Sequence, residues 1–147
     1  MVNVEEKIVF ILDDNEAWLR LFEYTIIPHF SLRNIKFHLN TNWSQMLESP
    51  DIKNASLFLI DFFLKNSPVK SQFSKLDQKA DITGLDLAIT CKSLSPNANI
   101  KIVTCGQALA LDILNKSAEL SSICEPKDIV TKPVSLEVVK LMINELS

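Results

Sequence analysis

The sequence predicts an α/β fold built on one doubly wound parallel sheet. Five short apolar runs, which are typical of buried strands, alternate with five segments whose apolar residues recur at helical spacing. Polar residues suited to chemistry follow four of these runs directly. Such alternation favours a parallel sheet covered by helices on both faces. The predicted strands are residues 8–12, 35–39, 57–60, 100–103 and 129–131.

Apolar periodicity and local punctuation define the five predicted helices. Pro28, Pro50 and Pro96 mark the ends of the first three, Gly84 lies near the start of the third, and Ser135 is the expected N-cap of the fifth. The periodic residues are Trp18, Leu21, Phe22 and Ile26 in the first helix, Trp43, Met46 and Leu47 in the second, Leu87, Ala88, Cys91 and Leu94 in the third, Ala108, Leu111 and Leu114 in the fourth, and Val139, Met142 and Leu146 in the fifth.

Five polar residues stand where predicted strands end: Asp13, Asp14, Asp61, Thr104 and Lys132. Because parallel strands end at one edge of a sheet, we expect these side chains to share one site. Carboxylates held close together raise one another's pKa unless a cation lies among them, and hard oxygen ligands favour Mg²⁺. An ammonium and a hydroxyl suit phosphoryl oxygens, and an aspartate can accept a phosphoryl group covalently. Asp61, alone at the end of its strand, is the expected acceptor.

Purely structural interpretations compete with this hypothesis. Asp13 and Asp14 could complement the dipole at a helix N-terminus. Thr104 is a residue type common in strands, and Lys132 before Pro133 could simply end one. Asp61 is harder to explain structurally, because a carboxylate between apolar residues is costly to bury without a partner.

The order of these residues resembles that of the receiver domain of two-component response regulators. The matching features are the acidic pair, the lone Asp61, the segment 84–87 that opens a helix, Thr104, and Lys132 followed by Pro133. The resemblance implies the flavodoxin-like strand order 2-1-3-4-5. It also implies a Mg²⁺ ion held by Asp13, Asp14, Asp61 and the backbone carbonyl of Phe63. Thr104 would sense the phosphoryl group, Lys132 would pair with it, and the peptide bond before Pro133 would be cis.

Three departures from the family pattern lead to further expectations. Residues 62–83 form a 22-residue connection, against roughly 2 to 6 residues for most strand-to-helix loops. Ile129 stands where receivers commonly carry an aromatic ring that moves on phosphorylation, so we expect a blunted switch there. Phe63, two residues after Asp61, should exclude water and prolong the life of an acylphosphate.

The connection itself is predicted to give this chain its specificity. Its net charge is +2, on a chain whose net charge is -3, so it could meet an acidic partner or the phosphoryl group. Phe73, Leu76 and Ala80 stand at helical spacing behind Ser71, which predicts a short amphipathic helix. The charged residues are Lys65, Lys70, Lys75, Lys79, Asp77 and Asp81. A surface excursion without a role is the alternative.

Composition is consistent with one cytoplasmic domain spanning residues 1–147. The chain is 47% hydrophobic and 22% charged, which is ordinary for a globular protein. Its acidic balance argues against a nucleic-acid partner, and no stretch predicts a signal peptide or a membrane span. Three scattered cysteines suit a reducing compartment better than a disulfide framework.

We therefore expect a stand-alone receiver. It would take a phosphoryl group from a histidine kinase or a histidine phosphotransfer protein, switch its contacts with an unidentified downstream protein, and catalyse only its own phosphorylation and dephosphorylation. One alternative is a Mg²⁺-dependent phosphohydrolase with an aspartyl nucleophile. That family places its nucleophile at the end of the first strand, with a second Asp two residues on, whereas the residue two beyond Asp13 is Asn15. Another alternative is a degenerate receiver that acts by protein contact without phosphorylation.

Overall fold

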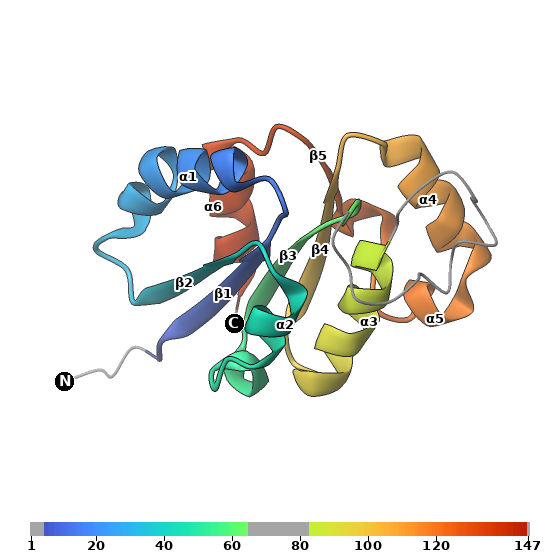
Figure 1. The fold of residues 1–147 in the computed structure, drawn as a ribbon, viewed down its shortest axis with the longest axis horizontal. Helices are drawn as coiled ribbons and strands as arrows, with labels where there is room; N and C mark the ends of the chain where they lie inside the picture. The colour runs from blue at the N-terminus through green and yellow to red at the C-terminus, as the bar shows by residue number, and fades with distance from the viewer. Residues whose placement is uncertain (1–4, 65–82, 147) are drawn as a thin grey trace.

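The computed structural model describes residues 5–64 and 83–146. Within them, five parallel strands form one sheet in the order β2-β1-β3-β4-β5, which confirms the predicted order (Figure 1). The strands are β1 (Lys7–Leu12), β2 (Ile35–Asn40), β3 (Leu57–Asp61), β4 (Asn99–Thr104) and β5 (Ile129–Thr131). Most of the connection at residues 62–83, including the predicted helix and the charged residues of that connection, lies outside the described residues.

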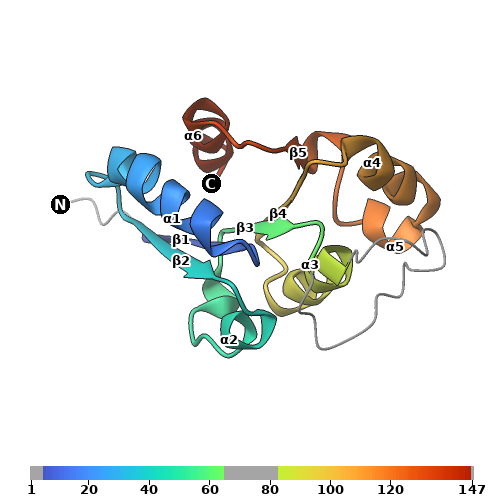
Figure 2. The same ribbon diagram turned by 45° about the horizontal axis from the view of Figure 1, so that its top comes forward.

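Helices cover both faces of the sheet. The α-helices are α1 (Glu16–Thr25), α2 (Trp43–Leu47), α3 (Thr83–Leu94), α4 (Gln107–Lys116), α5 (Ala118–Ser121) and α6 (Leu136–Asn144). Short 3₁₀ helices are η1 (Ile27–Phe30), η2 (Ile52–Asn54) and η3 (Pro126–Asp128). Helices α1 and α6 lie on one face and α2 and α3 on the other, with α4 and α5 beside β5 (Figure 2).

Strand alternation divides the interior into two cores. On β1, Val9 and Ile11 face the core beneath α1 and α6, whereas Phe10 faces the core beneath α2 to α5. Strand β3 alternates in the same way, with Leu59 in the first core and Phe58 in the second. Because both faces are covered, the central strands are apolar at nearly every position, as expected for a parallel sheet.

Two details of the predicted helices are corrected by the structure. The described residues contain six α-helices rather than five, because α5 follows α4 directly. With four residues it is too short to show periodicity; Ser117 caps it by accepting a hydrogen bond from the Leu120 N–H, and Leu120 is its buried residue. Pro28 does not end α1, which already stops at Thr25, but lies in the first turn of η1. Ser135 caps α6 as predicted, accepting from the Val138 N–H.

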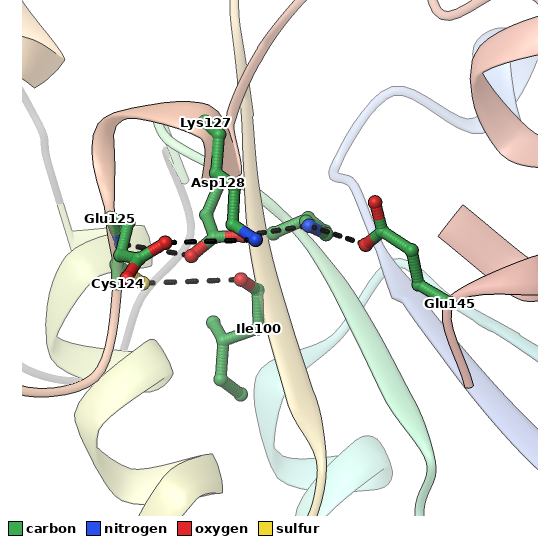
Figure 3. A network of polar contacts seen from close by, with 7 residues as sticks. Ile100, Cys124, Glu125, Lys127, Asp128 and Glu145 are labelled. Carbon is green, nitrogen blue, oxygen red and sulfur yellow. Dashed lines mark hydrogen bonds and ion pairs between the residues drawn. The ribbon is translucent and has the colours of Figure 1, made fainter. Parts of the chain in front are cut away.

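The buried Lys101 joins β4 to η3 and to the end of α6. The Lys101 ammonium lies 2.6 Å from an Asp128 carboxylate oxygen and 3.4 Å from one of Glu145. Figure 3 shows Asp128 and Glu145 in this network, together with Cys124, whose thiol lies near the Ile100 carbonyl oxygen. Burial lowers the pKa of Lys101, but the hydrogen bond to Asp128 and the two carboxylate charges outweigh it, so this pKa is raised. The network fixes η3 and the end of α6 against the sheet.

No helix in the described ranges is long and apolar enough to cross a bilayer.

Candidate functional site

The five polar residues predicted from the strand ends do lie at one edge of the sheet. Asp13 and Asp14 follow β1, Asp61 and Thr104 are the last residues of β3 and β4, and Lys132 follows β5. Their strands are neighbours, and the Lys132 N–H extends the ladder by donating to the Thr104 carbonyl oxygen at 3.0 Å. A cavity of about 380 Å³ opens here, lined by Asp13, Asp14, Asn15, Asp61, Phe63, Cys105 and Lys132.

Lys132 lies between two of the buried carboxylates. Its ammonium is 2.6 Å from Asp13 Oδ2 and 3.2 Å from Asp61 Oδ1. Burial lowers the pKa of Lys132, but the hydrogen bond to Asp13 and the charges of both carboxylates raise it by more. The pKa of Lys132 is therefore raised overall. Lys132 therefore stays positively charged at this edge. The peptide bond between Lys132 and Pro133 is cis, as the resemblance to receiver domains implies.

Asp61 is the most strongly perturbed carboxyl of the site. It is only 6% exposed, and burial raises its pKa, as do the neighbouring charges of Asp13 and Asp14. Lys132 opposes this shift, yet the pKa of Asp61 still reaches about 6. A carboxylate destabilised by burial and by negative neighbours is a good ligand for a cation.

The donor set matches a divalent metal. Asp13, Asp14 and Asp61 each place one carboxylate oxygen so that these atoms all lie within 4.8 Å of one another. Carboxylate oxygens are the ligands preferred by Mg²⁺ and Ca²⁺. Burial is the main cause of the raised pKa of Asp61, and the charges of Asp13 and Asp14 that add to it would be neutralised by such an ion. Phe63 lines the same cavity, and its carbonyl stays a predicted ligand.

Thr104 is fully buried below the cavity. Its hydroxyl oxygen accepts a hydrogen bond from the Gly106 N–H at 2.8 Å, which fixes the turn into α4. A hydroxyl that accepts one hydrogen bond can still donate its own proton. The bond to Gly106 therefore ties Thr104 to the start of α4 without using the hydroxyl proton.

Gly84 explains how α3 can begin so close to Asp61. Its N–H donates to the Phe62 carbonyl oxygen at 3.3 Å. A Cβ on this residue would lie 2.9 Å from that oxygen and closer still to the Asp61 carbonyl oxygen, so only glycine fits. The glycine of the predicted segment 84–87 thus serves the site rather than the helix.

The structure places Ile129 and Phe63, the two residues that depart from the family pattern, in different surroundings. Ile129 is buried in the core beneath α4. Phe63 lines the cavity, and its ring meets that of Phe62 edge-on at 4.6 Å. An aromatic ring, that of Phe63, therefore lies beside Asp61, whereas β5 carries the aliphatic Ile129 at the position where receivers commonly have a ring.

Three residues of the site were not predicted from the sequence. Asn15 and Cys105 line the cavity, and the Trp18 ring lies beside Lys132. Asn15 directly follows Asp14, and Cys105 directly follows Thr104. A search for polar residues up to three positions beyond each strand end would have found both. Trp18 is the third residue of α1. Its large apolar ring at helical spacing indicated a core residue, so no sequence pattern pointed to its contact with Lys132.

A larger polar cavity, of about 510 Å³, lies at the other edge of the sheet. Its lining includes Lys7, Lys53 and Glu145. Lys7 begins β1, Lys53 lies in η2 and Glu145 follows α6. Among the described residues, the cluster of three carboxylates lies at the Asp61 edge and not here. The chemistry therefore favours the edge that carries Asp61.

No protein-family model matches the chain, and no curated protein matches it in sequence. Solved structures do resemble it. A CheY-like response regulator receiver domain protein from Methanospirillum hungatei JF-1 has a TM-score of 0.59 at 18% identity, with 96% of this chain and 93% of that chain covered. A response regulator receiver domain from Methylobacillus flagellatus has a TM-score of 0.62 at 12% identity, with 97% and 100% covered.

A response regulator protein from Burkholderia pseudomallei also resembles the chain, with a TM-score of 0.54 at 18% identity over 97% of this chain and 67% of that one. That structure contains a phosphorylated aspartic acid, a calcium ion and citrate. The TM-scores and the coverage of nearly the whole of both chains show one architecture. This chain has the flavodoxin-like fold of CheY-like response regulator receiver domains.

Proposed function

We propose that the chain is a phosphorylatable receiver that accepts a phosphoryl group on Asp61 and switches its contacts with other proteins. The observation that carries this proposal is the convergence of Asp61 with two further carboxylates and a buried lysine in one cavity. A phosphohistidine on a histidine kinase or a phosphotransfer protein is the expected donor. The phosphorylated aspartic acid in the Burkholderia relative supports the assignment of this chemistry to the fold.

The transfer would begin with attack of an Asp61 carboxylate oxygen on phosphorus. A P–O bond forms, the P–N bond to the donor histidine breaks, and the electron pair leaves with the imidazole nitrogen, which takes up a proton. A Mg²⁺ ion held by Asp13, Asp14, Asp61 and the Phe63 carbonyl would neutralise charge on the phosphoryl oxygens. Lys132 would pair with one phosphoryl oxygen, and the Thr104 hydroxyl would donate to another.

The protein would turn over only its own acylphosphate, so we class it as a signalling module rather than an enzyme. The test is incubation with acetyl phosphate and Mg²⁺, followed by mass spectrometry. Asp61 should gain one phosphoryl group, and Asp61→Asn should gain none while keeping its circular dichroism spectrum, because the amide preserves the shape but is not a nucleophile. Labelling of Asp61→Asn at the wild-type level would refute the assignment.

Two further assays, phosphate release from small phosphate esters and Mg²⁺ binding, separate the two alternatives. Steady release of phosphate from small phosphate esters would favour a phosphohydrolase. Failure of the wild-type protein to bind Mg²⁺ and to form any acylphosphate would favour a receiver that acts by contact alone.

A further inference from the structure

The ring of Trp18 contacts the cation of the site. Lys132 Nζ lies over this ring, 5.2 Å from its centroid. The side chain of Lys132 is only 17% exposed, so water screens the contact poorly. An ammonium over an aromatic face is attracted by the negative quadrupole of the ring, and the attraction is strongest for tryptophan and for a desolvated cation.

Trp18 is itself held in place relative to Asp13. The backbone N–H of Trp18 donates to Asn15 Oδ1 at 3.1 Å, and the backbone N–H of Asn15 donates to Asp13 Oδ1 at 2.8 Å. The ring packs against that of the buried Phe22, with 5.6 Å between centroids. The start of α1 thus places the ring and Asp13 in one rigid unit.

The three contacts of the ammonium differ in what happens to them during the proposed chemistry. Asp13 and Asp61 would both bind the metal, and Asp61 would also carry the phosphoryl group. Their attraction for Lys132 would therefore fall when the site is filled. Among the contacts of Lys132 Nζ described here, only the one to Trp18 involves a group that neither metal nor phosphoryl would engage.

We infer that Trp18 is a positioning residue, which holds the Lys132 ammonium at the acceptor so that it can meet a phosphoryl oxygen once the carboxylates are occupied. This inference rests on the proposed function, because it assigns Trp18 a role in the same site. This positioning role of Trp18 differs from simple packing, because packing would depend on apolar bulk and not on the aromatic face.

Two substitutions separate the aromatic face from apolar bulk. Trp18→Leu keeps an apolar side chain and removes the ring, whereas Trp18→Phe keeps a ring with a weaker quadrupole. The affinity for beryllofluoride, a phosphoryl mimic, should fall about three- to tenfold in Trp18→Leu and about twofold or less in Trp18→Phe. Mg²⁺ affinity measured without the mimic should stay within about twofold in both, because the ring acts on the ammonium and not on the hard oxygen ligands.

A matched control is Trp43→Leu. Trp43 packs against the core on the other face of the sheet. This substitution should lower the melting temperature and leave both affinities unchanged. NMR supplies a signature independent of binding: the side-chain methylene protons of Lys132 should be shifted upfield by the ring in the wild type and in Trp18→Phe, and this shift should vanish in Trp18→Leu.

The outcomes are separable. If the wild type binds neither Mg²⁺ nor beryllofluoride, the proposed function fails and this inference fails with it. If the wild type binds both and Trp18→Leu binds beryllofluoride equally well, only the inference fails. It is also overturned if Trp18→Phe loses as much affinity as Trp18→Leu, if Mg²⁺ affinity falls by the same factor, or if Lys132 shows no ring-dependent shift.

Discussion

The backbone of Gly84, at the start of α3, lies against the carbonyl group of Asp61 with no room for a Cβ between them. This contact places the amino end of one helix directly beside the acceptor. Gly106, at the start of α4, differs: a Cβ there would meet Phe63 and Thr104 at an ordinary 3.6 Å.

Gly84→Ala should therefore displace the end of β3. We expect a loss of about 2 kcal/mol or more in the free energy of unfolding, since backbone rather than a flexible side chain must yield. Slower phosphorylation of Asp61 should accompany it. Gly106→Ala is the control and should cost less than about 1 kcal/mol. Urea denaturation measures both, and equal losses would contradict the argument.

The stability of the metal-free protein should depend on Asp61 and on pH. The pKa of this carboxyl is about 6 in the folded chain and near its ordinary value of 3.8 when unfolded. Between these values the folded state binds more protons, so the free energy of unfolding should fall as pH rises from about 4 to about 6.

Asp61→Asn removes this ionisation. Above about pH 6, and with EDTA present, the variant should be more stable than the wild type by about 1–2 kcal/mol, a figure reduced for solvent screening and for the lost attraction to Lys132. Below about pH 4 the two proteins should converge. A wild type more stable than Asp61→Asn at neutral pH without metal would show that the carboxylate is not destabilised.

The buried pair of Lys101 and Asp128 should matter far more than an exposed pair. Asp128→Asn leaves the Lys101 ammonium, whose side chain is 6% exposed, with the half-exposed Glu145 as its described carboxylate partner. We expect a cost of about 2–4 kcal/mol. Asp112→Asn breaks the exposed pair with Lys116 on α4 and should cost less than about 0.5 kcal/mol. Thermal denaturation of both variants checks this difference.

Because Ile129 is aliphatic, we expect phosphorylation to change the surface of α4 and β5 only slightly. Ile129 has no ring to fill space vacated by movement of Thr104. Comparison of NMR spectra of the free and beryllofluoride-bound protein should place the largest shifts elsewhere. A rearrangement confined to that surface would rule this prediction out.

Phe63 should lengthen the life of the acylphosphate by keeping water from it. Phe63→Ala should shorten the half-life several-fold, which can be followed as loss of phosphoprotein after removal of acetyl phosphate. Phe58→Leu is a suitable control, because Phe58 is fully buried in the core and does not line the cavity. A half-life unchanged by Phe63→Ala would assign that ring to packing alone.

The strands, their alternation with helices and five residues of the site could be predicted from the pattern of residue types. Parallel strands buried on both faces are apolar throughout, so their ends are easy to locate, and a polar residue at such an end must lie at one edge of the sheet. Asp13, Asp61 and Lys132 were found in this way. The order of the strands came only from the resemblance, because apolar periodicity says nothing about which strands are neighbours.

Tertiary structure decided what depends on side-chain direction and on close approach. Helix α5 is stabilised by one buried leucine and one cap, too little for a periodic signal. The Trp18 ring reaches Lys132, and Lys101 reaches Asp128 and Glu145, across segments far apart in the sequence. Gly84 is required by a backbone contact with Asp61 that no pattern of residue types encodes. Local periodicity reports burial, whereas these contacts follow from how the elements pack, and only the folded chain fixes that packing.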